Sequence, residues 1–534
     1  MFYDNDKVNL LTGLLKAYGI THVVLCPGSR NAMIVNNIVE SRLFTCYPVT
    51  DERSAGFQAL GIAQNVGKAA IVVTSGSALL NVAPAVVEAY YQRQSVVVVS
   101  ADRPQEDIDQ NVGQTMRQYG ALDNFVKRSV NLTDALGDNH SYHHRLVCEA
   151  LCACNFGPVH INVPLPNVTE CRMVENVHLE NRPVDLVVPT TLQTDIADEI
   201  FFGAKRPMIV IGNCHISLPE HVFSTLRQFI TILSEPLSDP TAQPFEGIVE
   251  NLPDELLPDL IIYIGGSLVC RSIHSRLAAA SDTRVWRVDA DCQLCSPFKR
   301  IDRVYGLSAE AFLHQLYATV TQRTDIVPSP FVKSWDKAFR VERQRLSDSI
   351  SDTDLSAASV VNYFETQLDD MFYNYHVHYA NSTAVRLACR YVSGHKVYCN
   401  RGVNGIDGCL STAAGFSAST ADMVFCVTGD LSFFYDQNAL WNNNLKGNLR
   451  VILLNDHHGG IFDRVRGLEQ CAHRDTFVSG RHSADARGIC TQNDIGYIAA
   501  KTADEMRLGI VRLLTEETNR PIVLEVTLKR VKTS

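Results

Sequence analysis

Short, almost wholly apolar runs rich in β-branched residues recur along this chain, and an amphipathic stretch follows each of them. In the first part of the chain they lie at 21–26 (THVVLC), 69–74 (AAIVVT), 95–100 (SVVVVS) and 157–166 (GPVHINVPLP). Strands that are apolar on both faces and alternate with helices indicate a parallel sheet covered by helices on each side. The pattern therefore predicts a doubly wound α/β unit.

Two further series of such runs predict two more units of the same kind. The second series lies at 207–212, 260–266 and 285–291, and the third at 395–400, 421–430, 449–456 and 520–528. A chain of 534 residues is also too long for a single hydrophobic core. We predict three domains, at 1–180, 190–330 and 355–534, with a polar linker over 170–191 and a helix and loop over 321–355.

Charge and composition exclude several classes of protein. Hydrophobic residues make up 46% of the chain and charged residues 20%, which is the globular range. The 48 basic and 58 acidic residues give a net charge of −10 without a long basic tract, so nucleic acid is not an expected partner. No apolar run approaches the ~20 residues of a membrane span, and the N-terminal residues do not resemble a signal peptide. We expect a cytoplasmic protein without a disulfide framework, in which several cysteines, such as Cys399 and Cys426, are buried thiols.

Open α/β sheets bind ligands beyond the carboxyl ends of their strands, and polar residues follow several of the predicted strands. Arg30 follows the first run in the sequence PGSRN, where its guanidinium offers a fork to a carboxylate or phosphate. Glu52 opens a helix whose face of small residues predicts close packing. Taken alone, Arg30 is more simply explained as a solvated residue of a turn. Glu52, taken alone, is more simply explained as a carboxylate that interacts with the helix dipole.

The third series carries two more such places. The segment 401–415 is a glycine-rich loop followed by small residues, which is typical either of a phosphate cradle or of a tight packing turn. Asp430 follows one strand, and Asn455, Asp456 and two histidines follow the next. Oxygen ligands at two neighbouring strand ends predict a binding site for a magnesium-bound diphosphate.

Taken together and in order, these motifs resemble a known family. PGSRN, TDERSAGFQALGIA, TSGSALLNVAPAVVEA, SADRP, GQTMRQ, NRGVNGIDGCLSTAAG and GDLSFFYD are similar to segments of the 2-succinyl-5-enolpyruvyl-6-hydroxy-3-cyclohexene-1-carboxylate synthases (SEPHCHC synthases, MenD). This family belongs to the thiamine-diphosphate-dependent enzymes. The resemblance covers the first and third units well and the middle unit poorly.

The resemblance implies both an architecture and a reaction. It implies an α/β chain of three doubly wound parallel-sheet domains: a pyrimidine-binding domain at 1–180, a central domain at 190–330 and a diphosphate-binding domain at 355–534. It implies a homodimer or homotetramer with each site shared between subunits. The implied transferase activity, in menaquinone biosynthesis, is decarboxylation of 2-oxoglutarate and conjugate addition of the resulting enamine to isochorismate.

The resemblance also implies roles for particular residues. Glu52 would be the catalytic residue that activates the cofactor. Thiamine diphosphate would contact Glu52, Arg401, Gly402, Gly405, Ile406, Asp407, Gly429, Asp430, Leu431, Ser432, Asp456, Ile461 and Phe462. Mg²⁺ (or Mn²⁺) would be held by Asp430, Asp456 and the backbone carbonyl of His458. The two dicarboxylate substrates would contact Ser29, Arg30, Arg103, Gln114, Ser382, Arg386 and Arg401.

Some residues depart from the family pattern. Asp456 stands where the family has asparagine and His458 where it has glycine, so Asn455 is an alternative metal ligand. In the middle unit, a basic pair is expected roughly at Arg271, and Ser272 replaces its second member. His457 and His458 are expected to shape the cofactor loop. Two alternatives remain open: another thiamine-diphosphate carboligase or 2-oxoacid decarboxylase, and a non-catalytic relative with a degenerate metal loop.

Overall fold

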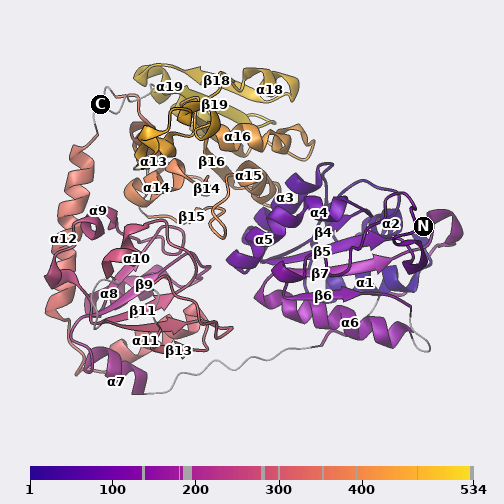
Figure 1. Ribbon diagram of the computed structural model, residues 1–534, viewed down its shortest axis with the longest axis horizontal. Coiled ribbons are helices and arrows are strands. Elements are labelled where there is room, and N and C mark those ends of the chain that lie inside the picture. Colours follow the sequence, from indigo (N-terminus) through magenta and orange to yellow (C-terminus); the bar gives the residue numbers. More distant parts are fainter. Residues whose placement is uncertain are drawn as a thin grey trace.

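Three parallel β-sheets, each flanked by helices, occupy successive stretches of the chain. The computed structural model describes residues 1–134, 139–179, 181–184, 195–277, 283–298, 301–350, 354–392, 394–465 and 467–528. In Figure 1 the first unit lies at the right, the middle unit at the lower left and the third unit at the top. The α/β class predicted from the apolar runs is confirmed.

The first unit has a six-stranded sheet in the order β3-β2-β4-β5-β7-β6. Its strands are β2 (His22–Leu25), β3 (Thr45–Pro48), β4 (Lys68–Val73), β5 (Ser95–Asp102), β6 (Arg128–Asn131) and β7 (Val159–Pro164). Its helices are α1 (Asp6–Ala17), α2 (Ala32–Ser41), α3 (Glu52–Val66), α4 (Ala78–Asn81), α5 (Ala83–Gln92) and α6 (Asn139–Ala153). A separate pair, β1 (Phe2–Tyr3) and β8 (Met173–Val174), is antiparallel.

That antiparallel pair includes the start of the polar linker predicted over 170–191. Residues 173 and 174 return to the N-terminus and form a strand there, so the start of the expected linker is tied to the first unit by backbone hydrogen bonds. Residues 180 and 185–191 of the expected linker lie outside the described residues.

The middle unit has a five-stranded sheet in the order β10-β9-β11-β12-β13. Its strands are β9 (Pro207–Ile211), β10 (Thr231–Ser234), β11 (Leu260–Ile264), β12 (Arg284–Val288) and β13 (Arg303–Tyr305). Its helices are α7 (Asp195–Phe201), α8 (Glu220–Phe229), α9 (Glu246–Glu250), α10 (Ser272–Leu277) and α11 (Ala309–Gln322). The predicted connecting helix follows as α12 (Pro330–Asp348), which runs along the left edge of Figure 1.

The third unit has six strands in the order β15-β14-β16-β17-β19-β18. They are β14 (Tyr375–Tyr379), β15 (Val397–Tyr398), β16 (Met423–Gly429), β17 (Leu449–Asn455), β18 (Gly496–Ala500) and β19 (Ile522–Thr527). The helices are α13 (Ala357–Leu368), α14 (Thr383–Tyr391), α15 (Cys409–Ala418), α16 (Asp430–Tyr435), α17 (Arg474–Phe477), α18 (Arg487–Gln492) and α19 (Ala503–Thr515). The strand expected at 395–400 is shorter than predicted and covers only Val397–Tyr398, which pair with Val377 and His378 of β14.

The first and third sheets share one strand order, although their sequences show no recognisable identity. In each, the second strand along the chain lies at one edge, followed by the first, third, fourth, sixth and fifth. The strand order reverses between β2 and β4 and again between β14 and β16. Such a reversal opens a crevice beyond the carboxyl ends of the strands, where α/β proteins bind ligands.

Burial explains why these strands form where they do. All seven residues of β17 are buried, and so are all six of β7, as expected for strands covered by helices on both faces. Helix α3 begins at Glu52 because the Asp51 carboxylate accepts hydrogen bonds from the backbone N–H groups of Arg53 and Ser54.

The first unit contacts the third through the packing of α3 against α15, which lie side by side in Figure 1. Glycines make the close approach feasible: a Cβ atom added at Gly61 would overlap the Thr412 carbonyl oxygen, and one added at Gly415 would overlap the Gln58 carbonyl. Gly408 faces the ring of Phe57 in the same way. The small-residue face predicted for the helix at Glu52 is therefore an interface between units.

Polar contacts reinforce this interface. The hydroxyl groups of Ser54 and Ser411 lie 2.9 Å apart, and the Asn65 amide donates to the Ser419 carbonyl at 3.1 Å. Near the start of α3, the Arg53 guanidinium donates to the Tyr435 carbonyl at 3.0 Å. These bonds run along the whole length of α3 and fix its register against the third unit.

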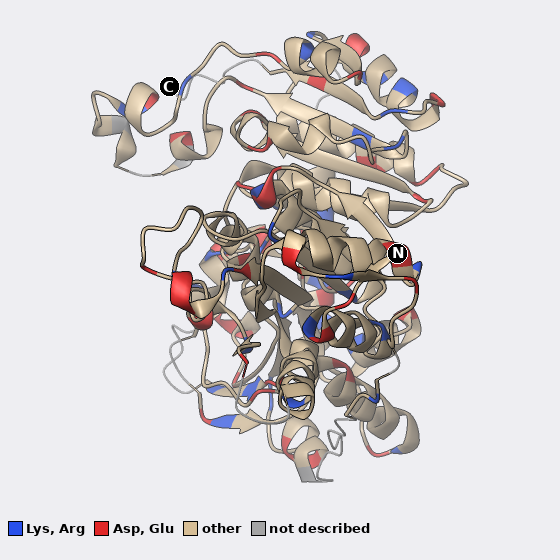
Figure 2. Cartoon of the chain, turned by 90° about the vertical axis from the view of Figure 1, so that its right-hand side faces the viewer, with Lys and Arg blue, Asp and Glu red and all other residues tan. Residues whose placement is uncertain are grey.

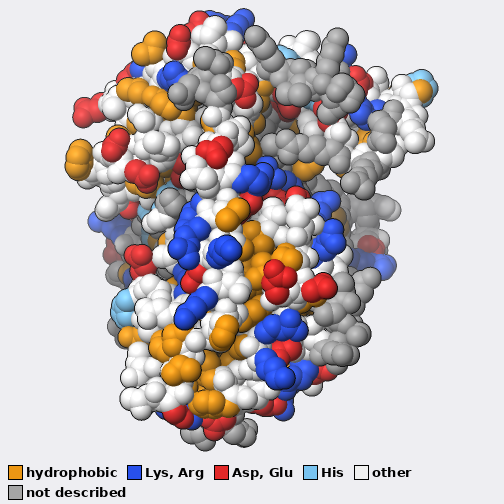
Figure 3. All heavy atoms as spheres, turned by 90° about the vertical axis from the view of Figure 1, so that its left-hand side faces the viewer, with side chains coloured by type: hydrophobic (Ala, Val, Ile, Leu, Met, Phe, Trp, Pro, Cys, Tyr) orange, Lys and Arg blue, Asp and Glu red, His pale blue; other side chains and the backbone are white. Residues whose placement is uncertain are grey.

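Charged residues are interspersed over the surface. Figure 2 shows acidic and basic residues interleaved along the chain. On the face drawn in Figure 3, Lys and Arg side chains lie among apolar and acidic ones. All sixteen cysteines are free thiols. In the part of the chain that the structure describes, no helix has the length and apolar character of a membrane span.

The close approach at Gly61 generates a stability prediction. We expect Gly61→Ala to lower the free energy of unfolding by about 1–3 kcal/mol, because the added methyl group forces α3 away from the Thr412 carbonyl. Urea unfolding followed by circular dichroism measures the change. Gly488→Ala is the matched control: Gly488 lies in the exposed helix α18 with nothing within 4 Å of the added methyl group. A control more destabilised than Gly61→Ala would contradict the prediction.

Candidate active site

Two of the predicted arginines lie together at the strand ends of the first unit. Arg30 lies between β2 and α2, two residues before the helix begins. Its guanidinium is buried and donates to the Leu165 carbonyl at 2.8 Å and to the Asn167 side chain at 2.9 Å. Burial lowers the pKa of Arg30, and the nearby Arg103 lowers it further. The fold thus holds two cations close together beside β5 and β7.

The uncharged residues predicted beside these arginines are exposed. Ser29 lies just before Arg30, and Gln114 has a left-handed backbone with φ 57° next to Gly76. The buried Gln118 holds this region: its amide donates to the Ala101 carbonyl at 3.1 Å, and its carbonyl accepts the Gly76 N–H at 2.6 Å. The sequence analysis did not predict a role for Gln118.

Glu52 lies at the first position of α3, as predicted. Its carboxylate is partly exposed and accepts one hydrogen bond from the Asn81 side chain at 3.2 Å. The rest of the helix is firmly packed against the third unit. Glu52 is therefore a carboxylate on a rigid support with room for a further partner.

Asp430 and Asp456 lie close together at the ends of β16 and β17. Asp430 is buried, and one of its oxygens accepts the Leu431 N–H at 2.6 Å while the other accepts the His458 N–H at 3.2 Å. Burial and the neighbouring Asp456 raise the pKa of Asp430 to about 7, and burial also raises the pKa of Asp456. Two carboxylates that repel each other in a buried place are typical of a cation site.

Asn455 and Asp456 differ in what their side chains contact. The Asn455 amide is buried and donates to the Ala484 carbonyl at 3.1 Å and to the Glu525 carboxylate at 2.6 Å, and its oxygen accepts the His457 N–H at 3.0 Å. Its hydrogen-bonding groups are therefore engaged away from Asp430. The Asp456 carboxylate instead lies beside Asp430 and 3.4 Å from the His458 N–H.

The His458 side chain binds the loop that follows β17. Its Nδ1 lies 2.9 Å from the Asp456 carbonyl, and its Nε2 lies 2.8 Å from the Asp463 carboxylate, which also pairs with Arg474 at 3.3 Å. Burial opposes the charged form of His458, but the bonds to Asp463 and Asp456 prevail and raise its pKa. His457 has a left-handed backbone with φ 63°. Both histidines thus shape the loop, and sequence reasoning missed Asp463 and Arg474.

The carboxylates of Asp430 and Asp456 are hard oxygen donors of the kind that suit Mg²⁺ or Mn²⁺. The His458 carbonyl, the third predicted ligand, accepts the Gly460 N–H at 2.9 Å. The imidazole Nε2 of His482 lies 3.3 Å from the same oxygen of Asp430 that His458 contacts. Its Nδ1 accepts the Ala484 N–H at 3.1 Å, so a neutral ring carries its proton on Nε2, facing Asp430. Within the described ranges, no three His, Cys, Asp or Glu side chains are grouped to hold a metal ion.

The loop that contains Gly402, Gly405, Ile406 and Asp407 connects β15 to α15. The Arg401 guanidinium at its start is buried and donates to the Asn381 side chain at 3.2 Å and to the Leu268 carbonyl at 3.1 Å. The Ser432 hydroxyl donates to the Ile406 carbonyl at 2.6 Å, which joins the loop to the end of β16. The Ile406 side chain is exposed, so it is available to a ligand.

Arg386 lies near Arg401. It belongs to α14, whose preceding residue Ser382 has a strained backbone with φ 78°. Arg386 donates to the Val269 carbonyl of the middle unit at 3.0 Å and lies 3.8 Å from the Glu246 carboxylate. Burial lowers the pKa of Arg386, and Arg401 and Arg271 lower it further. The predicted arginines thus form two groups, one in the first unit and one in the third.

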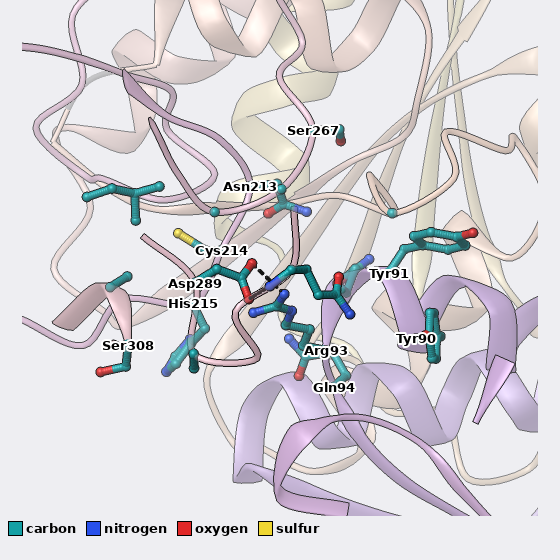
Figure 4. A pocket seen from close by; sticks show the side chains of 18 of the residues that line it. Tyr90, Tyr91, Arg93, Gln94, Asn213, Cys214, His215, Ser267, Asp289 and Ser308 are labelled. Carbon is teal, nitrogen blue, oxygen red and sulfur yellow. Dashed lines mark hydrogen bonds and ion pairs between the residues drawn. The ribbon is translucent and has the colours of Figure 1, made fainter. Parts of the chain in front are cut away.

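In the part of the chain that the structure describes, the two groups make no direct bond to each other, although Arg53, next to Glu52, donates to the Tyr435 carbonyl at the end of α16, the helix that begins at Asp430. Among the described residues, no hydrogen bond or ion pair joins Glu52 or Arg30 to Asp430, Asp456 or Arg386. A cavity of about 950 Å³ lies elsewhere, between the first and middle units, where Arg93 pairs with Asp289 at 2.7 Å (Figure 4). Gly402 and Ser267 also line it, so it borders the glycine loop rather than the Asp430 carboxylate.

Comparison with known proteins assigns the class. Residues 7–121 match the family described as thiamine pyrophosphate enzyme, N-terminal TPP binding domain. With three doubly wound parallel-sheet units and this match, the chain is a thiamine-diphosphate-dependent enzyme.

The relatives are more specific. The chain is 34% identical to the 2-succinyl-5-enolpyruvyl-6-hydroxy-3-cyclohexene-1-carboxylate synthase of Bacteroides thetaiotaomicron, over 98% of this chain and 96% of the relative. The enzyme of the same name from Flavobacterium psychrophilum is 30% identical, over 95% of this chain and 93% of the relative. The one from Cytophaga hutchinsonii is 31% identical, over 93% of this chain and 91% of the relative. The chain belongs to the SEPHCHC synthase family.

Glu235, a buried carboxylate behind Arg401, generates a pH prediction. It accepts the N–H groups of Val269 and Cys270, both at 2.9 Å, and burial raises its pKa from 4.5 to about 7. The folded state therefore holds this proton more tightly than the unfolded state. The contribution of Glu235 to stability is fully present below pH 4.5 and is lost as the pH rises through about 7.

Replacing the carboxyl group removes this dependence. We expect the unfolding free energy of the wild type minus that of Glu235→Gln to fall by about 3 kcal/mol between pH 4.5 and pH 8. Urea titrations of both proteins across this range measure the difference, in which the titration of shared groups cancels. A difference that stays constant with pH would contradict the raised pKa.

Proposed function

We propose that this protein catalyses the decarboxylation of 2-oxoglutarate and the addition of the remaining four-carbon unit to isochorismate, giving 2-succinyl-5-enolpyruvyl-6-hydroxy-3-cyclohexene-1-carboxylate. The observation that carries the proposal is the match to SEPHCHC synthases over nearly the whole chain, together with Glu52 at the start of α3. When bound, thiamine diphosphate supplies a thiazolium carbon that attacks a ketone and holds the electron pair released with CO₂. The chain supplies binding, orientation and charge.

Glu52 is the catalytic residue of this proposal. Its carboxylate would hydrogen-bond N1′ of the aminopyrimidine and favour the tautomer that removes the thiazolium proton. The rigid packing of α3 against α15 supports this role, because proton transfer requires a carboxylate held in place. Ile406, exposed on the glycine loop, would support the bent cofactor.

We assign the diphosphate to the third unit. Gly402, Gly405 and Asp407 of the glycine loop, and Gly429, Leu431 and Ser432 at the end of β16, would surround it. Asp430, Asp456 and the His458 carbonyl would hold Mg²⁺ or Mn²⁺ between the protein and the diphosphate. The engagement of the Asn455 amide with Glu525 favours Asp456 as the ligand.

The arginines would bind the carboxylates of the two substrates. Arg30, Arg103, Arg386 and Arg401 bring four cations to an otherwise acidic protein, and guanidinium forks match carboxylates in geometry. Ser29, Gln114 and Ser382 would add uncharged contacts. Ile461 and Phe462, both half-buried, would form an apolar wall beside the thiazolium. A pyruvate-specific enzyme would have little use for so many cations.

We also propose that each site is shared between two subunits, as the resemblance to the family implies. Residues 1–180 would form the pyrimidine-binding domain, 190–330 the central domain and 355–534 the diphosphate-binding domain. Each site would combine the first group of one subunit with the third-unit group of another, in a homodimer or homotetramer. Sixteen free thiols are consistent with a cytoplasmic location.

A direct assay tests the reaction. With thiamine diphosphate and Mg²⁺, we expect CO₂ release from 2-oxoglutarate to depend on isochorismate. Glu52→Gln should lower the rate by about 10²–10⁴-fold, because the amide cannot move the proton, while binding of thiamine diphosphate by calorimetry stays close to wild type. Release without isochorismate would indicate a 2-oxoacid decarboxylase. No release with Mg²⁺ or Mn²⁺ would favour the non-catalytic relative.

Mixing two inactive variants tests the shared site. Glu52→Gln removes a first-unit group and Asp430→Ala a third-unit group, so a hybrid of the two keeps one site with both groups intact. We co-express the two variants with different tags and purify the hybrid through both tags. Because one of its two sites is intact, we expect up to half of the wild-type activity per dimer. Hybrids that assemble but stay inactive would show that each site is built within one chain.

A further inference from the structure

Glu88 is a buried carboxylate of the first unit that binds the third unit. It lies on α5 and is 2% exposed. One oxygen accepts the Gly402 N–H at 2.6 Å, and the other accepts the Val403 N–H at 2.9 Å. Both acceptors therefore hold two successive amides of the glycine loop. Sequence reasoning assigned no role to this residue.

The surroundings of Glu88 fix its carboxylate. The Gln92 amide donates to the first oxygen at 2.6 Å and also to the Cys399 carbonyl at 3.3 Å. A Cβ atom added at Gly402 would lie 2.8 Å from the Glu88 carbonyl oxygen and 3.0 Å from its carboxylate. Only glycine lets the loop approach this closely, so Gly402 and Glu88 form one matched contact.

All three units bind this loop. Besides Glu88 of the first unit, the Ser267 hydroxyl of the middle unit donates to the Arg401 carbonyl at 2.5 Å. Within the third unit, the Asn381 amide donates to the Gly405 carbonyl at 2.6 Å. The Gly402 and Val403 amides are the part of the loop that the first unit holds, and Glu88 supplies the acceptors.

A packing role alone does not account for these contacts. Burial disfavours the charged carboxylate and raises its pKa, so an apolar side chain of similar size would cost less at a position that only fills space. The two amide donors lower that pKa again, which is the signature of a carboxylate bound to specific partners. Those partners belong to the loop that carries Arg401 and Ile406.

We propose that Glu88 is a positioning residue that holds the glycine loop 401–408 in the conformation that binds thiamine diphosphate. The inference rests on the proposed function, which assigns this loop to the cofactor. Glu88 acts through the backbone of Gly402 and Val403 and touches neither substrate nor cofactor. The first unit thereby sets the cofactor loop of the third unit in the same chain.

The test compares cofactor affinity with stability. Glu88→Gln keeps the size of the side chain but turns one acceptor into a donor facing an N–H group. We expect the Kd of thiamine diphosphate, measured by calorimetry with Mg²⁺ on the full-length protein, to rise about tenfold. Glu88→Asp keeps the charge but shortens the reach, and we expect a smaller rise in the same direction. If Glu88→Gln fails to fold, the Kd of thiamine diphosphate for Glu88→Asp provides the test.

Asp259→Asn is the matched control. The Asp259 carboxylate also accepts two successive amides, those of Lys205 and Arg206 at 2.8 and 2.9 Å, but within the middle unit. We expect the Asp259→Asn substitution to lower the melting temperature of the protein without changing the Kd of thiamine diphosphate. A Kd in the Glu88 variants within twofold of that in Asp259→Asn would overturn the inference.

A third variant separates this inference from the proposed function. Asp430→Ala removes a proposed metal ligand and should abolish measurable binding of thiamine diphosphate. If Asp430→Ala binds the cofactor normally, the proposed site is wrong. If it loses binding while both Glu88 variants keep wild-type affinity, only the role of Glu88 is wrong.

Discussion

The packing of α3 against α15 is the contact on which the rest of the structure depends. Gly61, Gly408 and Gly415 let the two helices and the loop before α15 approach closely, so shape rather than charge sets their spacing. Glu52 begins α3, and the glycine loop leads into α15. A single interface therefore fixes the position of Glu52, the proposed catalytic carboxylate of the first unit, and of the glycine loop proposed to bind the cofactor in the third.

Buried charges near the proposed site bind mostly to the backbone. Arg30 donates to the Leu165 carbonyl, Arg401 to the Leu268 carbonyl, and Glu88 accepts from two amides. Such partners satisfy the hydrogen bonds without neutralising the charge. Buried arginines held in this way are available for the anionic substrates proposed above, in a protein whose net charge is −10.

The loop after β17 brings acidic and basic side chains together. It contains Asp456 and His458, the two positions predicted to depart from the family pattern. The imidazole binds the Asp456 carbonyl and the Asp463 carboxylate, and Arg474 also pairs with Asp463. Asp456 and Asp463 are thus linked through His458, and Arg474 at the start of α17 pairs with Asp463. Asp463 follows Phe462 directly, but its bond to His458 and its pairing with Arg474 depend on how the loop folds.

The sequence by itself determined the local elements and the chemistry they carry. Apolar runs predicted buried parallel strands, Glu52 was correctly placed at a helix start, and Asp430 and Asp456 at two neighbouring strand ends, because these features depend on residues close in sequence. Only the tertiary structure decided the shared strand order of the first and third sheets, the engagement of Asn455 with Glu525, and the reach of Glu88 to the glycine loop. Each joins residues far apart in the chain, and their pairing depends on how whole units pack, which no local pattern of side chains records.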